Sequence, residues 1–115
     1  MTETEASETP TVPQYVGSAE EFREQVAENH IVFVDFYADW CGPCKMLEPI
    51  VEDLAAETPA TVLKVDVDEQ QELAAQFQIR GVPTTALFVD GDAEEILVGV
   101  RGKDQYAGLI DRYAN

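Results

Sequence analysis

Residues 31–37 read Ile-Val-Phe-Val-Asp-Phe-Tyr, and six of these seven residues are apolar, β-branched or aromatic. A strand with apolar side chains on both faces is typical of the centre of a sheet that helices cover on both sides. Asp35 is the exception. An isolated carboxylate in such a strand is costly to keep charged, so we expect burial to raise its pKa towards neutrality. The segment therefore predicts a buried central strand that carries one carboxyl group.

Helical and strand patterns alternate along the rest of the chain. Ser18 and Glu21 form a capping-box signature for a first helix, and Gly91 supplies a residue that tolerates positive φ between two late strands. The expected elements are a short strand near residue 15, a helix over about 18–29, the strand at 31–37, a helix from about 41 that is kinked at Pro49, a strand at 61–67, a helix over about 69–77, strands in 84–90 and 94–100 around a turn at 90–92, and a closing helix through 106–113. This order predicts an α/β domain with a mixed sheet, because a hairpin follows a βαβ crossover.

Both cysteines, Cys41 and Cys44, lie where the central strand is expected to give way to a helix. The carboxyl end of a strand is where α/β folds place their chemistry. Gly42 allows a close approach, and Pro43 fits the first turn of a helix. Residues three apart in a helix have Cα atoms about 5 Å apart, which suits a reversible disulfide. The helix N-terminus stabilises a thiolate at Cys41, so we expect Cys41 to be the exposed attacking nucleophile and Cys44 the resolving thiol.

Two other interpretations of the cysteine pair are less favourable. A closed zinc site needs four ligands, and the chain offers two cysteines and one histidine, His30, unless two chains share the metal. We therefore expect no metal, with His30 as a surface residue at a helix-to-strand turn. A purely structural disulfide over so short a loop constrains little of the unfolded chain. The pair is best explained as a redox dithiol.

Charge and composition limit the partners. The 115 residues suit one domain, and 23 acidic against 7 basic residues give a formal net charge of -16. Such a surface repels nucleic acid and anionic membranes. The acidic surface has two explanations that the sequence leaves open. One is adaptation to a high-salt cytoplasm, in which case low salt should destabilise the fold, and the other is the selection of basic partners.

The N-terminal stretch is acidic and rich in Thr, Glu and Pro. We expect residues 1–13 to form a disordered acidic tail ahead of a domain over 14–115. The stretch has no apolar core of the kind that a signal peptide requires, and no segment of the chain is long and apolar enough to cross a bilayer. These features predict a cytoplasmic protein, where a lone cysteine pair is more often catalytic than structural.

Three sequence strings together resemble the thioredoxin family: VDFYADWCGPCK at 34–45, RGVPT at 80–84 and LVGV at 97–100. The resemblance extends from about residue 14 to the end of the chain. It implies the thioredoxin fold, with a central mixed sheet of about five strands flanked by four helices. It also implies a monomeric dithiol reductant with no bound cofactor, whose Cys41–Cys44 disulfide forms as it reduces target proteins. A thioredoxin reductase, either an NADPH flavoprotein or a ferredoxin-linked enzyme, would restore the dithiol.

The resemblance also assigns supporting roles. Asp35 matches the buried aspartate that helps deprotonate Cys44, although a structural carboxylate paired with Lys64 is a second interpretation, and the two can coexist. Pro83 matches the family's cis-proline, which leaves the Val82 backbone free to pair with an extended substrate, whereas an ordinary turn proline is the alternative. The expected apolar docking platform around the nucleophile comprises Trp40, Val82, Gly99 and Val100.

Two other functional classes are alternatives to a dithiol reductant, and the sequence departs from the family pattern at two positions. A non-catalytic adaptor would use the same platform without needing the cysteines. A disulfide-forming oxidant or isomerase would need a compartment that this N-terminal sequence does not address. Tyr37 stands where many members carry Trp. Gly102 stands where Ser or Thr is usual, so we expect a weak cap on the last helix.

Overall fold

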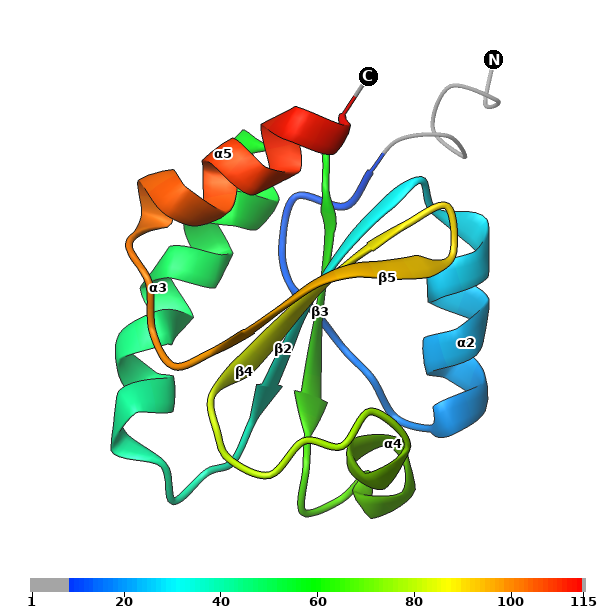
Figure 1. Cartoon of the computed structure of the whole chain (residues 1–115), viewed down its shortest axis with the longest axis vertical. Coiled ribbons are helices and arrows are strands. Elements are labelled where there is room, and N and C mark those ends of the chain that lie inside the picture. The colour runs from blue at the N-terminus through cyan, green and yellow to red at the C-terminus, as the bar shows by residue number, and fades with distance from the viewer. Residues whose placement is uncertain (1–8, 115) are drawn as a thin grey trace.

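The structure, a computed structural model, describes residues 9–114 (Figure 1). Within this range the chain forms five strands and four helices in the predicted order. They are β1 (Gln14–Tyr15), α2 (Ala19–Glu28), β2 (Ile31–Tyr37), α3 (Gly42–Glu57), β3 (Thr61–Asp66), α4 (Gln71–Gln76), β4 (Thr84–Val89), β5 (Asp92–Val98) and α5 (Lys103–Tyr113). Residues 1–8 of the expected tail lie outside the described residues, and residues 9–13 form no helix or strand.

The strands of the described part form one mixed sheet in the order β1-β3-β2-β4-β5. β1, β3 and β2 run parallel, while β4 is antiparallel to both β2 and β5. Figure 1 shows α3 and α5 on one face of the sheet and α2 and α4 on the other. The arrangement confirms the predicted thioredoxin fold, with β2 as the buried central strand.

Side chains of β2 alternate between two hydrophobic clusters. Val32, Val34 and Phe36 belong to the cluster on the side of α2 and α4. Ile31 and Phe33 belong to the cluster on the side of α3 and α5. Successive side chains of a strand point to opposite faces, so Asp35 shares the face of Ile31 and Phe33. The buried carboxyl group therefore lies under α3, the helix that carries Cys44.

Local signals in the sequence set the helix start and the hairpin. The Ser18 hydroxyl accepts a hydrogen bond from the Glu21 N–H at 3.1 Å, and Glu21 Oε1 accepts one from the Gly17 N–H at 2.8 Å. The hairpin turn is tighter than predicted. Asp90 has φ 52° and Gly91 has φ 90°, whereas Asp92 already belongs to β5. Two consecutive positive φ angles are what a two-residue hairpin turn of type I′ requires, and aspartate tolerates that conformation better than most residues.

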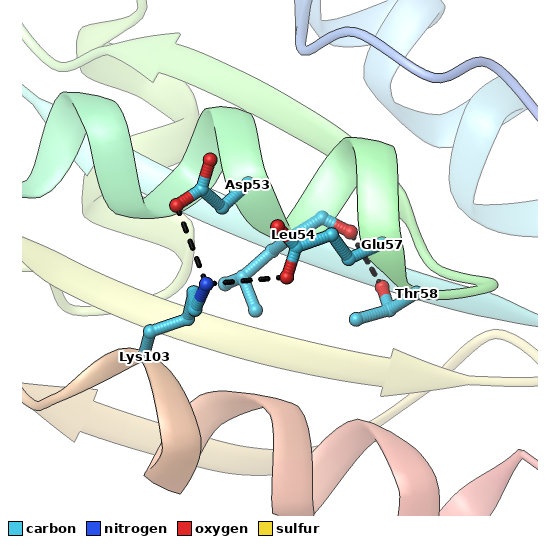
Figure 2. Close-up of polar contacts among 5 residues, drawn as sticks. All are labelled: Asp53, Leu54, Glu57, Thr58 and Lys103. Carbon is cyan, nitrogen blue, oxygen red and sulfur yellow. Dashed lines mark hydrogen bonds and ion pairs between the residues drawn. The ribbon is translucent and has the colours of Figure 1, made fainter.

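The last helix packs on α3 through buried side chains that include Tyr106 and Ile110, and its first turn adds surface ion pairs instead of a capping side chain. Gly102 occupies the cap position of α5 and makes no side-chain hydrogen bond, as expected. Figure 2 shows the next residue, Lys103, reaching two carboxylates of α3. Its Nζ lies 3.5 Å from Asp53 Oδ2 and 3.2 Å from Glu57 Oε1. At the end of α3, the Thr58 hydroxyl donates to the Leu54 carbonyl oxygen at 2.7 Å.

Candidate active site

A disulfide joins Cys41 and Cys44 at the start of α3, with Cα atoms 5.3 Å apart. Cys41 is the N-cap residue of the helix, and its Sγ accepts a hydrogen bond from the Cys44 N–H at 3.2 Å. Pro43 lies in the first turn, where its missing N–H costs no hydrogen bond. The pairing and its place at the strand-to-helix junction agree with the sequence prediction. A Cβ at Gly42 would meet no atom of the described residues within 4 Å, so packing among them does not require this glycine.

Burial does not distinguish the two cysteines. Cys41 is 4% exposed and Cys44 is 3% exposed, so the prediction of an exposed Cys41 is wrong for the disulfide form. Both residues pack with Ala38, and Tyr37, Val67 and Val82 border this small cluster. Because the two cysteines are equally buried, we attribute their different reactivity to the position of Cys41 at the helix N-terminus. The Cys41 sulfur receives a backbone N–H that would stabilise a thiolate at this position.

Asp35 is fully buried in β2, and neither of its carboxylate oxygens has a hydrogen-bond partner among residues 9–114. The pKa of Asp35 is raised from 3.8 to about 6: burial is the main cause, the Lys64 charge opposes the rise, and the Glu48 charge adds to it. On β4, Asp35 is paired in register with Thr85, whose buried hydroxyl also has no partner in the described range. The carboxyl group can therefore take up and release a proton close to neutral pH.

Lys64 occupies the strand position beside Asp35 but is paired with another group. The two residues are register partners of the adjacent parallel strands β2 and β3. The Lys64 Nζ lies 3.9 Å from Glu48 Oε2, 4.4 Å from the centre of the Tyr37 ring and 5.3 Å from that of Tyr15. The structure of residues 9–114 thus shows no direct Asp35–Lys64 ion pair, and the interpretation of Asp35 as a carboxylate paired with Lys64 is wrong in that respect. The lysine instead acts on Asp35 through its charge.

Sequence reasoning missed Glu48. This residue lies four positions after Cys44 in α3, so both belong to one side of the helix. The spacing alone was a usable signal, but glutamates at such positions are usually solvated. The contact between Glu48 and the buried Lys64 of β3 depends on the packing of α3 against the sheet, which the sequence pattern does not show.

Two further segments border the cysteines. The end of β2 and the start of β4 are adjacent, since Phe36 pairs with Thr84, and Figure 1 shows the loops that continue from them at one end of the sheet. The Val82–Pro83 peptide bond is cis, as the resemblance implied. The Pro83 carbonyl oxygen accepts from the Gly99 N–H at 2.9 Å, and Gly99 has φ 88°.

The expected docking platform is only partly exposed. Trp40 is 71% exposed, and its Nε1 donates to Asp68 Oδ2 at 2.9 Å. The Val82 backbone makes no backbone hydrogen bond within the described range, so both of its polar groups are free for a partner. Val100 instead packs partly into the cluster under α5. A pocket of about 110 Å³ adjoins the platform and is lined by Trp40, Val67, Ile79, Arg80, Gly81 and Val82.

No group of three or more His, Cys, Asp or Glu side chains in residues 9–114 is arranged to hold a metal ion. His30, at the turn before β2, is engaged elsewhere, with Nδ1 2.7 Å from Asp90 Oδ1. Among the helices of this same part of the chain, none combines the length and apolar character that crossing a membrane needs.

Comparison with known proteins agrees with this geometry. The family model "Thioredoxin" matches residues 14–112. A thioredoxin of Chlamydia trachomatis is 46% identical over 99 residues, which cover 85% of this chain and 96% of that protein. The solved structure of a mutant thioredoxin from Halobacterium salinarum NRC-1 is 48% identical with a TM-score of 0.91, and the match covers 95% of this chain and 96% of that one. The solved structure of a thioredoxin from Plasmodium falciparum is 35% identical with a TM-score of 0.79, and the match covers 87% of this chain and 98% of that one.

A redox-active disulfide at a helix start, the five-stranded mixed sheet of the described part and a family match over most of the chain all agree. The chain belongs to the thioredoxin family of disulfide oxidoreductases.

Proposed function

We propose that this protein reduces disulfide bonds of target proteins by reversible exchange at Cys41 and Cys44. The observation that carries the proposal is the disulfide at the N-terminus of α3, with the Cys41 sulfur in the cap position and accepting a backbone N–H. A thiolate at such a site is stabilised at neutral pH, and the thiolate is the attacking species in exchange.

The reaction begins from the dithiol. The Cys41 thiolate attacks one sulfur of the target disulfide, the target S–S bond breaks, and the other target sulfur leaves as a thiolate that takes a proton. Cys44 then loses its proton and attacks the Cys41 sulfur. The intermolecular bond breaks, the second target sulfur leaves as a thiol, and the Cys41–Cys44 disulfide of the structure is formed. Two electrons pass from the protein to the target.

Asp35 is the group best placed to receive the Cys44 proton. It lies on the face of the sheet that α3 covers, and its pKa of about 6 makes it largely ionised, yet still basic, at pH 7. Lys64, beside it in β3, tempers that pKa. We assign Asp35 the role of proton acceptor and Lys64 that of a supporting charge.

The platform supplies the binding site for an extended target segment. The unpaired Val82 backbone next to Pro83 can add one short stretch of strand pairing, while exposed Trp40 provides apolar contact. Gly99 borders the platform beside Pro83, because its N–H donates to the Pro83 carbonyl oxygen. Partners on this proposal are cytoplasmic disulfide proteins and a thioredoxin reductase. A net charge of -16 disfavours nucleic acid and anionic membranes, and a monomer suffices for the chemistry.

Single-cysteine variants test the proposal. The reduced wild-type protein should cleave the disulfides of insulin, Cys44→Ser should accumulate a stable mixed disulfide through Cys41, and Cys41→Ser should do neither. A non-catalytic adaptor would bind targets equally well after loss of either cysteine, and this result would refute the proposal.

The reduction potential of the pair separates a reductant from an oxidant. Thioredoxins are the reference for a reducing pair, at about −270 mV, whereas a dedicated oxidant lies near about −120 mV. We expect a value at the reducing end, and a value at the oxidising end would favour the disulfide-forming alternative.

A further inference from the structure

Glu48 is a charged residue that the proposed chemistry leaves without a role. It projects from α3 with half of its side chain exposed, and its Oε2 lies 3.9 Å from the Lys64 Nζ. The lysine side chain, in contrast, is only 4% exposed. A pocket of about 110 Å³ between β1, β3 and α3 is lined by Pro13, Tyr15, Glu48, Val51, Glu52 and Lys64. The ammonium group of a buried lysine thus meets a carboxylate at the wall of a small pocket.

The lysine has a second carboxylate close by that it does not contact. Asp35 and Lys64 are register partners on adjacent strands, and neighbouring positions of this kind place side chains on the same face of the sheet. Even so, both Asp35 oxygens lack a hydrogen-bond partner in the part of the chain that the structure describes. An ammonium beside a buried carboxylate normally pairs with it, because each charge relieves the desolvation of the other. Here the ammonium is directed towards Glu48 and the rings of Tyr37 and Tyr15.

This inference rests on the proposed disulfide exchange and deepens it. We propose that Glu48 is a positioning residue of the exchange: it holds the Lys64 ammonium in the pocket beside α3, and so leaves the Asp35 carboxyl without a hydrogen-bonded cation.

The consequence is a stronger base under Cys44. Burial is the main cause of the raised pKa of Asp35, the Lys64 charge opposes it, and the Glu48 charge adds to it. Without Glu48, the negative charge is lost and the ammonium is free to move towards Asp35. Both changes stabilise the ionised carboxylate, so the pKa of Asp35 falls. Asp35 then accepts the Cys44 proton less readily.

The remaining groups around Asp35 and Lys64 are not expected to obscure the effect. Burial raises the pKa of Tyr37 to about 12, so this phenol stays neutral throughout the relevant range. The cysteines are joined in the oxidised form and do not titrate. In the described part of the chain, the titratable groups that line the pocket or contact the Lys64 ammonium are Tyr15 from β1, Tyr37 from β2, and Glu48 and Glu52 from α3. Asp35 is paired in register with Thr85 of β4, Tyr106 of α5 packs against Phe33 of β2, and the charges of Asp66, Asp39 and Glu69 act on Tyr37.

The test is Glu48→Gln, which keeps the size of the side chain and removes its charge. Glu52→Gln is the matched control, because Glu52 lies on the same helix and lines the same pocket but makes no ion pair with Lys64. The measurement is the pH titration of the Asp35 carboxyl carbon by ¹³C NMR in the oxidised, full-length protein. We expect Glu48→Gln to lower the midpoint by about one pH unit, the low end of the range for a carboxylate that gains a nearby cation. Glu52→Gln should move it much less.

A midpoint that stays at its wild-type value in Glu48→Gln, or that moves equally in both variants, would overturn the proposal. Introducing Glu48→Gln into a Lys64→Met background separates positioning from a direct charge effect. The change caused by Glu48→Gln should be clearly smaller in that background. An equal change would show that Glu48 does not act through Lys64 and would also overturn the proposal.

These titrations involve no substrate, so they do not depend on whether the protein reduces disulfides. Failure of the insulin assay would reject the proposed function and leave the titration result intact. A normal insulin assay with an unmoved Asp35 midpoint would reject only the role of Glu48.

Discussion

Replacing Asp35 with asparagine should stabilise the oxidised protein more at neutral pH than at pH 4. Burial raises the pKa of this carboxyl from 3.8 to about 6. At 1.36 kcal/mol per pKa unit, that rise corresponds to about 3 kcal/mol of lost stability once the group is ionised in both states. The substituted amide cannot ionise, so the variant avoids this loss.

The sign of the effect fixes the pH window. Well below pH 3.8 the carboxyl is protonated in the folded and unfolded states, and it contributes no penalty. As the pH rises from 3.8 to about 6, the unfolded chain ionises first and the wild-type protein progressively loses stability. The pH-dependent part of the stability difference between Asp35→Asn and wild type should therefore grow from less than about 1 kcal/mol at pH 4 to about 3 kcal/mol at pH 7.5.

Urea unfolding of the oxidised proteins, followed by far-UV circular dichroism at constant salt from pH 4 to pH 8, measures this difference. An unpartnered amide at this position adds an offset that does not depend on pH, so the test is the pH-dependent part alone. Asp111→Asn, at an exposed position of α5, is the control and should show almost no pH-dependent difference. A difference for Asp35→Asn that is the same at pH 4 and pH 7.5 would refute the reasoning.

Three further predictions concern the rest of the fold. Tyr106→Phe should lower the free energy of unfolding by about 1–2 kcal/mol in urea titrations, because the buried phenol oxygen accepts from the Arg101 N–H at 2.9 Å and that donor would lose its partner; an unchanged value would contradict this. Gly102→Ser should raise that free energy by about 0.5 kcal/mol, since a Cβ at this position meets nothing of the described residues within 4 Å and a hydroxyl can cap α5, whereas a loss of stability would show that the cap does not form. With 23 acidic and 7 basic residues, the thermal midpoint should rise as salt is added, because salt screens the self-repulsion; a midpoint independent of salt would argue against salt adaptation and leave partner selection as the explanation of the acidic surface.

Much of the fold was predictable because local signals and the global architecture agree. The capping box at Ser18 and Glu21 starts α2 as expected. The apolar run of β2 is buried at all but its last position, as a central strand requires. The hairpin was placed correctly but its turn was drawn one residue too long, since positive φ was attributed to Gly91 alone and Asp90 shares it.

The candidate site was less predictable where burial and side-chain pairing depend on tertiary packing. The strand-to-helix junction and its cysteine pair follow from short-range pattern. The near-complete burial of Cys41 does not, because its neighbour Val82 comes from a loop about forty residues away in the chain. The partner of Lys64 was also unpredictable, because Asp35 and Glu48 both lie within reach only after β2, β3 and α3 have packed.

The most direct test of the proposed chemistry is the pH dependence of alkylation of each cysteine in the reduced protein. Iodoacetamide labelling, resolved by mass spectrometry of the peptides that contain Cys41 and Cys44, reports the two thiols separately. We predict that Cys41 reacts first, with a midpoint well below about 8.5, the ordinary value for a cysteine, while Cys44 remains largely unlabelled at neutral pH. Equal labelling of the two thiols, or faster labelling of Cys44, would contradict the assignment of Cys41 as the attacking sulfur.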